Sequence, residues 1–234
     1  MKASDLMVRC LEEEGVEQFF GVPGEENADF MISLLDSKID FVLCRHEQAA
    51  AFMADAYGRL TGKAGVCLGT LGPGVTNLLT GIADANMDRA PVIALIGQGS
   101  TKRLHKVSHQ IMDAIRMCEP VSKWAQTILA PENVTEIIRK AFKIAEAEKP
   151  GLCVVELPED IAKMEVDDTP MKPMKVRRPG ADHKAVAQAA ELIKEAKNPI
   201  ILAGNGAIRK RAAAQLTRLS HNLGVGVVNT FMGK

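Results

Sequence analysis

Aromatic residues and net charge are both scarce in this chain of 234 residues. Only 4% of the residues are aromatic, so aromatic platforms that stack on single-stranded nucleic acid are not expected. The 29 lysines and arginines balance the 29 aspartates and glutamates, which leaves no overall field to attract nucleic acid or an anionic membrane. The composition therefore favours a small molecule or another protein chain as the partner.

Long apolar runs and paired cysteines are also missing. No apolar run reaches the roughly 18 residues that a membrane-spanning helix needs, and no signal-peptide core follows the N-terminus. The five cysteines are widely spaced, never form Cys-x-x-Cys, and mostly lie in apolar runs, where a reduced cysteine behaves as a small hydrophobic residue. The five histidines show no metal-ligand spacing. We therefore predict a cytoplasmic protein without a disulfide framework or a metal site in this chain.

Helical and strand patterns alternate along residues 1–165. The predicted helices cover residues 4–14, with Ser4 as the N-cap, and residues 28–35, 47–61, 75–86 and 134–148. The predicted strands cover residues 18–22, 40–44, 65–69, 91–97 and 151–157. Because continuous apolar strands interleaved with helices indicate a mostly parallel sheet covered on both faces, we predict a doubly wound α/β domain.

The alternating pattern stops at residues 166–182, which contain prolines and a group of basic residues that includes Lys175, Arg177 and Arg178. A nucleic-acid arm is one interpretation, but the short length and the balanced charge of the chain favour a solvated linker. A second α/β pattern follows, with helices at 183–196 and 207–223 and strands at 199–203 and 224–229. Two strands cannot form an independent core, so we expect residues 183–234 to be the first part of a truncated second domain.

Residues 69–74 form a glycine-rich loop, Gly-Thr-Leu-Gly-Pro-Gly, between a predicted strand and a predicted helix. Backbone amides and a helix N-terminus at such a place can face a ligand. The order of the glycines is the reverse of the dinucleotide fingerprint, which disfavours an NAD site. Taken alone, the loop is more typical of a tight turn, and the Gly204-Asn-Gly206 turn is a weaker signal still.

Glu47 opens the predicted helix 47–61 and directly follows a predicted strand. A carboxylate at this position is normally a solvated first-turn residue that the helix dipole stabilises. Here the flanking sequence is apolar and rich in alanine, which predicts a buried helix start, and strand ends are where ligands bind in doubly wound sheets. Asp84 and Asp88 are most simply a solvated helix face, since paired acid–base catalysis would require both to be buried.

Three motifs occur in order: Gly-Val-Pro-Gly-Glu at 21–25, Arg-His-Glu-Gln-Ala-Ala-Ala-Phe-Met-Ala-Asp-Ala-Tyr-Gly-Arg-Leu-Thr-Gly at 45–62, and Gly-Pro-Gly-Val-Thr-Asn at 72–77. Together they resemble the pyrimidine-binding domain of thiamine-diphosphate enzymes of the acetolactate synthase group. The resemblance assigns residues 1–165 to that domain, 166–182 to a linker, and 183–234 to the first part of the family's central domain.

The resemblance implies roles for individual residues. Glu47 matches the glutamate that hydrogen-bonds N1′ of the aminopyrimidine and stabilises its imino tautomer, a task that suits a carboxylate able to share a proton in a desolvated pocket. Gln110, in the His109-Gln110 pair, matches a glutamine that approaches the substrate side of the cofactor and is expected to be catalytic. The implied cofactor contacts are Val22, Pro23, Gly24, Glu47, Thr70, Pro73, Gly74 and Asn77.

The implied reaction condenses two pyruvates into 2-acetolactate with release of CO₂. The family's diphosphate and Mg²⁺ motif, Gly-Asp-Gly followed by Asn-Asn, is absent here and belongs to a C-terminal domain, so we expect this chain alone to be inactive. The resemblance further implies a homodimer or homotetramer with a shared active site. A regulatory subunit and the acceptor, pyruvate or 2-oxobutyrate, remain open.

Several alternatives remain at this point. Pyruvate oxidase and sulfoacetaldehyde acetyltransferase are neighbouring activities, whereas glyoxylate carboligase is disfavoured because it replaces the glutamate with an apolar residue. A non-catalytic nucleotide-binding module of the same fold is the alternative of another class, and the retention of Glu47 speaks against it. The segments Val-Ser-His-Gln-Ile-Met-Asp at 107–113 and Pro-Val-Ser-Lys-Trp at 120–124 resemble the catabolic, FAD-independent enzymes more closely, and FAD binding stays open.

Overall fold

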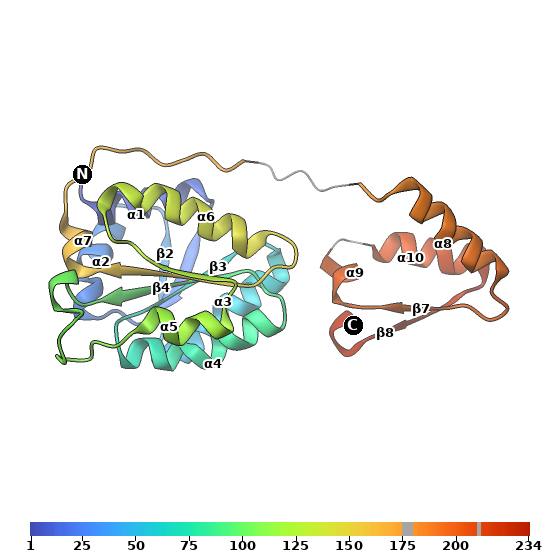
Figure 1. Cartoon of the computed structure of the whole chain (residues 1–234), viewed down its shortest axis with the longest axis horizontal. Helices are drawn as coiled ribbons and strands as arrows, with labels where there is room; N and C mark the ends of the chain where they lie inside the picture. Colours follow the sequence, from blue (N-terminus) through green and yellow to red (C-terminus); the bar gives the residue numbers. More distant parts are fainter. Residues whose placement is uncertain (175–179, 210–211) are drawn as a thin grey trace. The chain divides into compact units, whose positions relative to one another are not determined.

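The computed structural model describes residues 1–174, 180–209 and 212–234. The chain divides into two compact units, residues 1–175 and residues 176–234, and each unit is treated by itself (Figure 1). The predicted linker includes residues 175–179, so the basic residues Lys175, Arg177 and Arg178 lie outside the described residues. None of the helices in the described segments is both long enough and apolar enough to cross a membrane.

The first unit contains a six-stranded sheet in which every neighbouring pair is parallel. Its strands are β1 (Gln18–Gly21), β2 (Asp40–Leu43), β3 (Gly65–Gly69), β4 (Val92–Gln98), β5 (Trp124–Thr127) and β6 (Leu152–Pro158). The order across the sheet is β2-β1-β3-β4-β6-β5. After β1 the chain turns toward β2, and after β3 it turns the opposite way toward β4. The ends of β1 and β3 therefore form a topological switch point, where ligands bind in sheets of this kind.

Helices cover both faces of this sheet. They are α1 (Ala3–Glu13), α2 (Ala28–Leu34), α3 (Glu47–Thr61), α4 (Pro73–Met87), α5 (Ala114–Cys118), α6 (Val134–Glu146) and α7 (Glu159–Lys163). Single turns of 3₁₀ helix are η1 (Glu25–Asn27), η2 (Thr101–Arg103), η3 (Glu119–Val121) and η4 (Pro131–Asn133). Figure 1 shows α1 and α6 on one side of the strands and α4 and α5 on the other.

The burial of β4 shows that helices cover both faces of the sheet. Ile93 and Leu95 belong to the core beneath α1, α2 and α6, whereas Val92, Ala94 and Ile96 belong to the core beneath α3, α4 and α5. Successive side chains of a strand point to opposite faces, so a strand buried on both faces must be apolar at every position. The predicted doubly wound α/β fold is confirmed, and the sheet of the first unit is wholly parallel.

The second unit pairs two parallel strands, β7 (Ile200–Ala203) and β8 (Gly226–Asn229), with helices α8 (His183–Glu195), α9 (Asn205–Arg209) and α10 (Ala213–Leu223). A 3₁₀ turn, η5 (Phe231–Gly233), follows β8. The prediction of a single helix over 207–223 is wrong, because α9 ends before α10 begins at Ala213; residues 210–211 of that range lie outside the described residues.

Two further predictions of local structure are corrected. Ser4 does not cap the first helix: Lys2 is the N-cap residue, its backbone N–H donates to Asp5 Oδ2 at 3.0 Å, and the buried Ser4 hydroxyl accepts instead from Ser33. The short elements α5, β5 and α7 were not predicted. β5 is half-buried at every position and shows no alternation, and a helix of only five residues, such as α5 or α7, carries little periodicity. Gly62, by contrast, ends α3 with a positive φ of 73°, which confirms the predicted end of this helix at residue 61.

Candidate active site at the carboxyl edge of the sheet

Glu47 is the first residue of α3 and is buried, with 8% of its surface exposed, as the alanine-rich sequence around it predicted. His46 caps the helix, because its Nδ1 accepts from the backbone N–H of Gln48 at 3.1 Å. The positive end of the helix dipole favours a carboxylate at this position. The beginning of α3 therefore holds an acidic side chain inside the protein at the edge where the parallel strands end.

Among the described residues, the carboxylate of Glu47 has one polar side-chain partner, Asn77 on α4. Asn77 Nδ2 donates to Glu47 Oε2 at 2.9 Å. The other oxygen faces the start of α4, where a Cβ added to Gly74 would lie 3.6 Å from Glu47 Oε1. Within the described part of the chain no basic side chain forms a salt bridge with Glu47. One carboxylate oxygen is thus oriented by an amide, and the second lies beside a residue without a side chain.

The turn after β1 and the loop after β3 are in direct contact. A Cβ added to Gly24 would lie 2.5 Å from Cβ of Thr70, so only glycine permits this approach. Thr70 Oγ1 donates to Glu26 Oε2 at 2.9 Å and so fastens the two segments to each other. Sequence reasoning missed Glu26, although it immediately follows the quoted motif at 21–25. Of the other predicted residues of this turn, Val22 bonds β3 through its backbone N–H to Leu68, and Pro23 is exposed.

Gln110 is carried by the long segment between η2 and α5, and its backbone rests on Gly72. A Cβ added to Gly72 would lie 2.7 Å from the Gln110 carbonyl oxygen, and φ is positive at both residues, 54° and 55°. A positive φ is costly for a residue other than glycine and persists where the surroundings enforce it. The exposed Gln110 side chain therefore starts from a backbone pressed onto the loop that leads into Pro73, the exposed first residue of α4.

The structure thus brings together most of the residues that the sequence singled out, from four segments at one edge of the sheet. The direct contacts and close approaches described above involve Gly24, Glu47, Thr70, Gly72, Gly74, Asn77 and Gln110. The site combines a buried carboxylate, an amide that orients it, and several glycines that leave room beside it. These hydrogen-bonding groups and this space suit a flat, polar heterocycle. Proton sharing with a ring nitrogen is the chemistry that such a carboxylate can perform.

Glu156 and Gln98 form a second buried polar group near this edge, which sequence reasoning did not identify. Glu156 on β6 is 4% exposed and Gln98 on β4 is 2% exposed. Gln98 Nε2 donates to Glu156 Oε1 at 2.9 Å, and Thr127 Oγ1 donates to Glu156 Oε2 at 2.6 Å. Burial raises the pKa of the Glu156 carboxyl above its ordinary value of 4.5, although these two hydrogen bonds oppose the shift. A polar residue in an otherwise apolar strand was the available signal.

The aspartates of α4 do not form an acid–base pair at the site. Asp84 and Asp88 are partly exposed, and both bind Arg59, with closest N–O distances of 3.0 and 2.8 Å. Arg59 also pairs with the buried Asp55 one turn earlier on α3. Burial raises the pKa of Asp55 even though Arg59 opposes the shift. This group joins α3 to α4, and Asp84 and Asp88 lie at the surface, as predicted.

The cysteines lie in surroundings that disfavour a reactive thiolate. All five thiols are free and buried, and burial raises the pKa of Cys118 to about 11 and that of Cys153 to about 12, which disfavours the reactive thiolate. The described residues contain no cluster of three or more histidine, cysteine or acidic side chains that could hold a metal ion.

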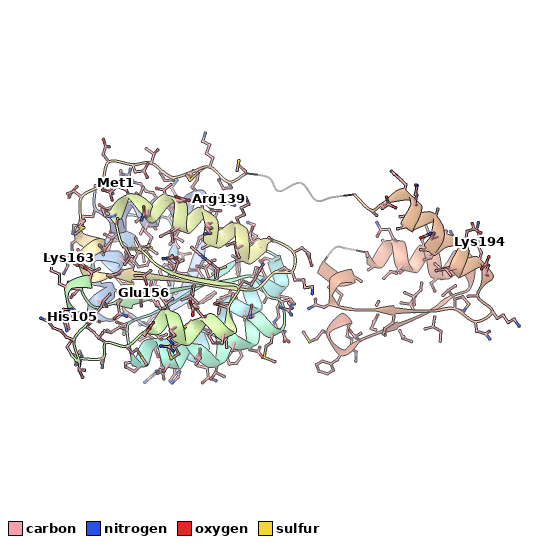
Figure 2. The ribbon with its side chains drawn as sticks, in the orientation of Figure 1. Met1, His105, Arg139, Glu156, Lys163 and Lys194 are labelled. Atoms are coloured by element: carbon pink, nitrogen blue, oxygen red, sulfur yellow. The ribbon has the colours of Figure 1, made fainter. Side chains whose placement is uncertain are left out.

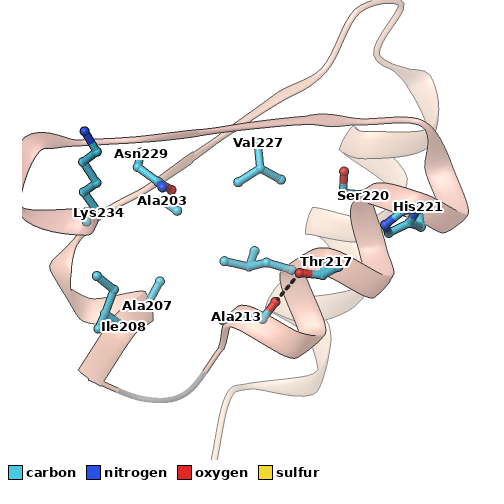
Figure 3. A pocket seen from close by; sticks show the side chains of 12 residues that line it. Ala203, Ala207, Ile208, Ala213, Thr217, Ser220, His221, Val227, Asn229 and Lys234 are labelled. Carbon is cyan, nitrogen blue, oxygen red and sulfur yellow. Dashed lines mark hydrogen bonds between the residues drawn. The ribbon is translucent and has the colours of Figure 1, made fainter.

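A pocket of about 470 Å³ lies in the second unit between α9, α10 and β8 (Figure 3). Much of its lining is apolar, including Ala203, Ile208 and Val227. Of its hydroxyl groups, that of Thr217 donates to a backbone carbonyl at 2.9 Å and that of Ser220 to another at 2.7 Å. The prediction of a turn at Gly204-Asn-Gly206 is corrected: Asn205 and Gly206 are the first two residues of α9, whose next residues Ala207 and Ile208 line the pocket.

The fold and the site define a doubly wound α/β domain with a buried carboxylate at its switch point. The chain belongs to the thiamine pyrophosphate enzyme family. The family model described as "Thiamine pyrophosphate enzyme, N-terminal TPP binding domain" matches residues 1–117, and the one described as "Thiamine pyrophosphate enzyme, central domain" matches residues 186–234. The first match covers half of the chain and contains Glu47, Asn77 and Gln110.

Individual relatives agree with this assignment. A probable acetolactate synthase large subunit of Methanocaldococcus jannaschii is 42% identical over 241 residues, which cover 100% of this chain and 41% of the relative. A catabolic acetolactate synthase of Raoultella terrigena is 41% identical over 236 residues, which cover 97% of this chain and 42% of the relative. A glyoxylate carboligase of Escherichia coli O157:H7 is 36% identical over 237 residues, which cover 100% of this chain and 40% of the relative. The chain therefore spans about two fifths of the length of these relatives.

Proposed function

We propose that this chain is the pyrimidine-binding part of an acetolactate synthase, which condenses two pyruvates into 2-acetolactate with release of CO₂. The observation that carries the proposal is the buried Glu47 at the start of α3, oriented by Asn77 at 2.9 Å. Two of the relatives named above are called acetolactate synthases, and they match the chain over nearly its whole length.

The residues present fit thiamine diphosphate. Glycine at 24 lets the turn after β1 approach the Thr70 side chain, and glycine at 72 lets the backbone of Gln110 rest on the loop. Glycine at 74 leaves the space beside Glu47 Oε1 without a side chain. We assign the cofactor contacts to Val22, Pro23, Gly24, Glu47, Thr70, Pro73, Gly74 and Asn77. When bound, thiamine diphosphate supplies a nucleophilic carbon for the keto group of pyruvate and takes up the charge left when CO₂ departs.

The protein's own residues would prepare that chemistry. Glu47 shares a proton with a ring nitrogen, and the start of α3 stabilises its negative charge. Asn77 holds one oxygen of the Glu47 carboxylate, which fixes the direction in which the other oxygen points. Gln110, seated on Gly72, offers an amide on the substrate side. The buried position of Glu47 keeps competing water away from the shared proton, which strengthens the interaction.

Glu47 and its amide partner disfavour two of the alternative functions. The identity to glyoxylate carboligase, 36%, is not far below that to the acetolactate synthases, so overall similarity decides little. The carboxylate at Glu47 favours an acetolactate synthase over glyoxylate carboligase, in which an apolar residue takes this place. Its burial and its amide partner favour an enzyme over a non-catalytic nucleotide-binding module. Pyruvate oxidase and sulfoacetaldehyde acetyltransferase are the remaining alternatives.

The wider assembly follows from the same proposal. We assign residues 1–165 to the pyrimidine-binding domain, 166–182 to a linker and 183–234 to part of the central domain, which the division into two compact units supports. Mg²⁺ would be held through residues that this sequence does not contain. We propose a homodimer or homotetramer in the cytoplasm, where five free thiols would stay reduced. FAD and a regulatory subunit are to be tested rather than assigned.

The test is an assay of the complete reading frame with thiamine diphosphate, Mg²⁺ and pyruvate, with and without FAD. We expect acetolactate in both cases, and Glu47→Gln should lower its formation by about 100-fold or more, the scale of a positioned acid–base group. Glu136→Gln is the matched control, because Glu136 lies exposed in the first turn of α6. Pyruvate consumption without acetolactate would move the assignment to pyruvate oxidase, and absence of any pyruvate chemistry would overturn the proposal.

A further inference from the structure

We propose that Gln98 and Glu156 are positioning residues that hold the segment carrying Gln110 against the glycine loop of the active site. The proposal rests on the proposed function for the role of Gln110, and on the hydrogen bonds of the two buried side chains for the rest. Figure 2 shows Glu156 in the interior of the first unit. His105, which belongs to the segment that carries Gln110, lies at the edge of that unit.

Every hydrogen-bonding group of the Gln98 side chain is used. Its Nε2 donates to Glu156 Oε1 at 2.9 Å and to the carbonyl oxygen of Met112 at 3.1 Å, while its Oε1 accepts from the backbone N–H of Gly99 at 3.0 Å. The bond to Met112 fixes the backbone two residues after Gln110. A buried amide with all its groups satisfied has one favourable orientation, so Gln98 acts as a rigid link between β4 and this segment.

Glu156 determines the orientation of the Gln98 side-chain amide. Its side chain lies on the same face of the sheet as Leu152 and Val154, beneath α5, and Thr127 holds its second oxygen at 2.6 Å. With Oε1 in place as acceptor, the two N–H groups of Gln98 are divided between Glu156 and Met112. Without that acceptor the amide is free to turn over and present its oxygen to the Met112 carbonyl, which would repel it.

The segment is held at both of its ends and is exposed between them. Just before it, at the start of η2, the backbone N–H groups of Ser100 and Thr101 donate to Glu159 and Asp160 of α7 at 3.1 and 2.9 Å. At the other end lies the Gln98 bond to Met112. Between them, residues 104–107 are exposed. The position of Gln110 over Gly72 therefore depends on these terminal attachments, of which Gln98 makes the nearer one.

A purely architectural role explains the group less well. β4 and β6 are already joined by a parallel register of seven residue pairs, from Val92 with Leu152 to Gln98 with Pro158. Burying a carboxyl group is costly, and an apolar pair would hold two strands together as well or better. The side chain contributes a contact that backbone pairing cannot make, which is the bond from the sheet to Met112.

The first arm of the test is hydrogen exchange in the full protein without cofactor. The informative amides are those of Ile111 and Ala114, whose acceptors are Ser108 and Met112 within the segment. In Gln98→Leu and Glu156→Leu we expect these amides to exchange about tenfold faster or more, as for a segment released from one anchoring bond, while β3 amides stay unchanged. Glu156→Gln should restore protection, because its amide oxygen can still accept from Gln98.

Thr127→Val is the matched control, because it removes a bond to the same carboxyl group on the side away from the segment. Protection of the Ile111 amide should be kept in this variant.

The second arm of the test measures the kinetics of the complete enzyme. Gln98→Leu should lower kcat/KM for pyruvate about tenfold with the Kd of thiamine diphosphate unchanged, since Gln98 is buried and is not one of the assigned cofactor contacts.

Unchanged exchange at Ile111 and Ala114 in Gln98→Leu, or equal acceleration throughout β3, β4 and β6, would overturn the positioning role. An unaltered kcat/KM with a loosened segment would overturn its link to catalysis. If the complete enzyme shows no pyruvate chemistry, the proposed function fails, and the exchange arm still decides whether Gln98 and Glu156 hold the segment.

Discussion

Asn77 Nδ2 donates to Glu47 Oε2 at 2.9 Å and so links the beginning of α3 to the second turn of α4. The two residues are 30 positions apart, and the bond forms only when α3 and α4 lie against each other. Small residues permit that contact: a Cβ added to Gly81 would lie 2.6 Å from Cβ of Ala51. The orientation of the acidic side chain is thus a consequence of helix packing.

The Glu47–Asn77 pair is predicted to act as a unit. A hydrogen bond to a charged group contributes about 1.5–3 kcal/mol, so Asn77→Ala should lower acetolactate formation about tenfold or more. In the double variant Glu47→Gln/Asn77→Ala the fold-loss of activity should be smaller than the product of the two single-variant losses, because the second change removes a partner that the first has already altered. A double-mutant cycle on kcat/KM measures the coupling. Fully multiplicative losses would show that Asn77 does not act through Glu47.

The close approach of Gly24 to Thr70 is predicted to be intolerant of any side chain. Gly24→Ala places a Cβ 2.5 Å from Thr70 Cβ and should cost about 1–3 kcal/mol in the free energy of unfolding through overpacking. It should also weaken binding of thiamine diphosphate, measured by calorimetry. Gly226→Ala is the control, because among the described residues no atom beyond its chain neighbours lies within 4 Å of its added Cβ, and its effect should stay within about 0.5 kcal/mol. Equal effects of the two changes would contradict the prediction.

Arg59 is predicted to be essential for stability because it neutralises the buried Asp55. Arg59→Met should cost roughly 3 kcal/mol near neutral pH, since it leaves a buried carboxylate without its partner. Burial already raises the pKa of Asp55, and loss of Arg59 raises it further. The destabilisation should therefore shrink as the pH falls and Asp55 becomes neutral, which urea titrations across the acidic range would measure. Lys163→Met, at an exposed side chain with N–O distances of 3.9 Å or more, should have little effect at any pH.

The buried Glu156 is predicted to make the protein less stable as the pH rises. Its folded-state pKa lies above the ordinary 4.5, so the unfolded chain releases this proton first and gains stability relative to the folded protein. The contribution of Glu156 is therefore fully favourable below pH 4.5 and is lost as the pH rises through the folded pKa.

Glu156→Gln should remove that dependence, so the variant gains stability relative to the parent as the pH rises above 4.5. Free energies of unfolding measured from about pH 4 to pH 8 provide the check. Glu136→Gln should show a flat difference over the same range because Glu136 is exposed. A parent whose stability rises with pH relative to Glu156→Gln would contradict the assigned sign.

Regular elements with strong patterns were predicted closely from the sequence. The helix from Glu47 to Thr61 and the strand from Gly65 to Gly69 have the predicted bounds, and Gly62 ends the helix as expected. The short edge strand β5 was missed because Trp124 and its neighbours are only half buried and show no clear alternation. The first helix began at Ala3 rather than after Ser4, since the Ser4 side chain turns inward to a partner 29 residues away.

Local pattern and three motifs were enough to determine from the sequence that this is a parallel α/β domain with Glu47 at a helix start near a glycine loop. Periodicity and turn residues act over a few positions, so they carry that information without a fold. The tertiary structure alone decided that Asn77 orients Glu47, that Gln110 rests on Gly72, and that Gln98 and Glu156 meet beneath α5. Each of these contacts joins segments that come together only when the strands take their order in the sheet, and no local preference encodes that order.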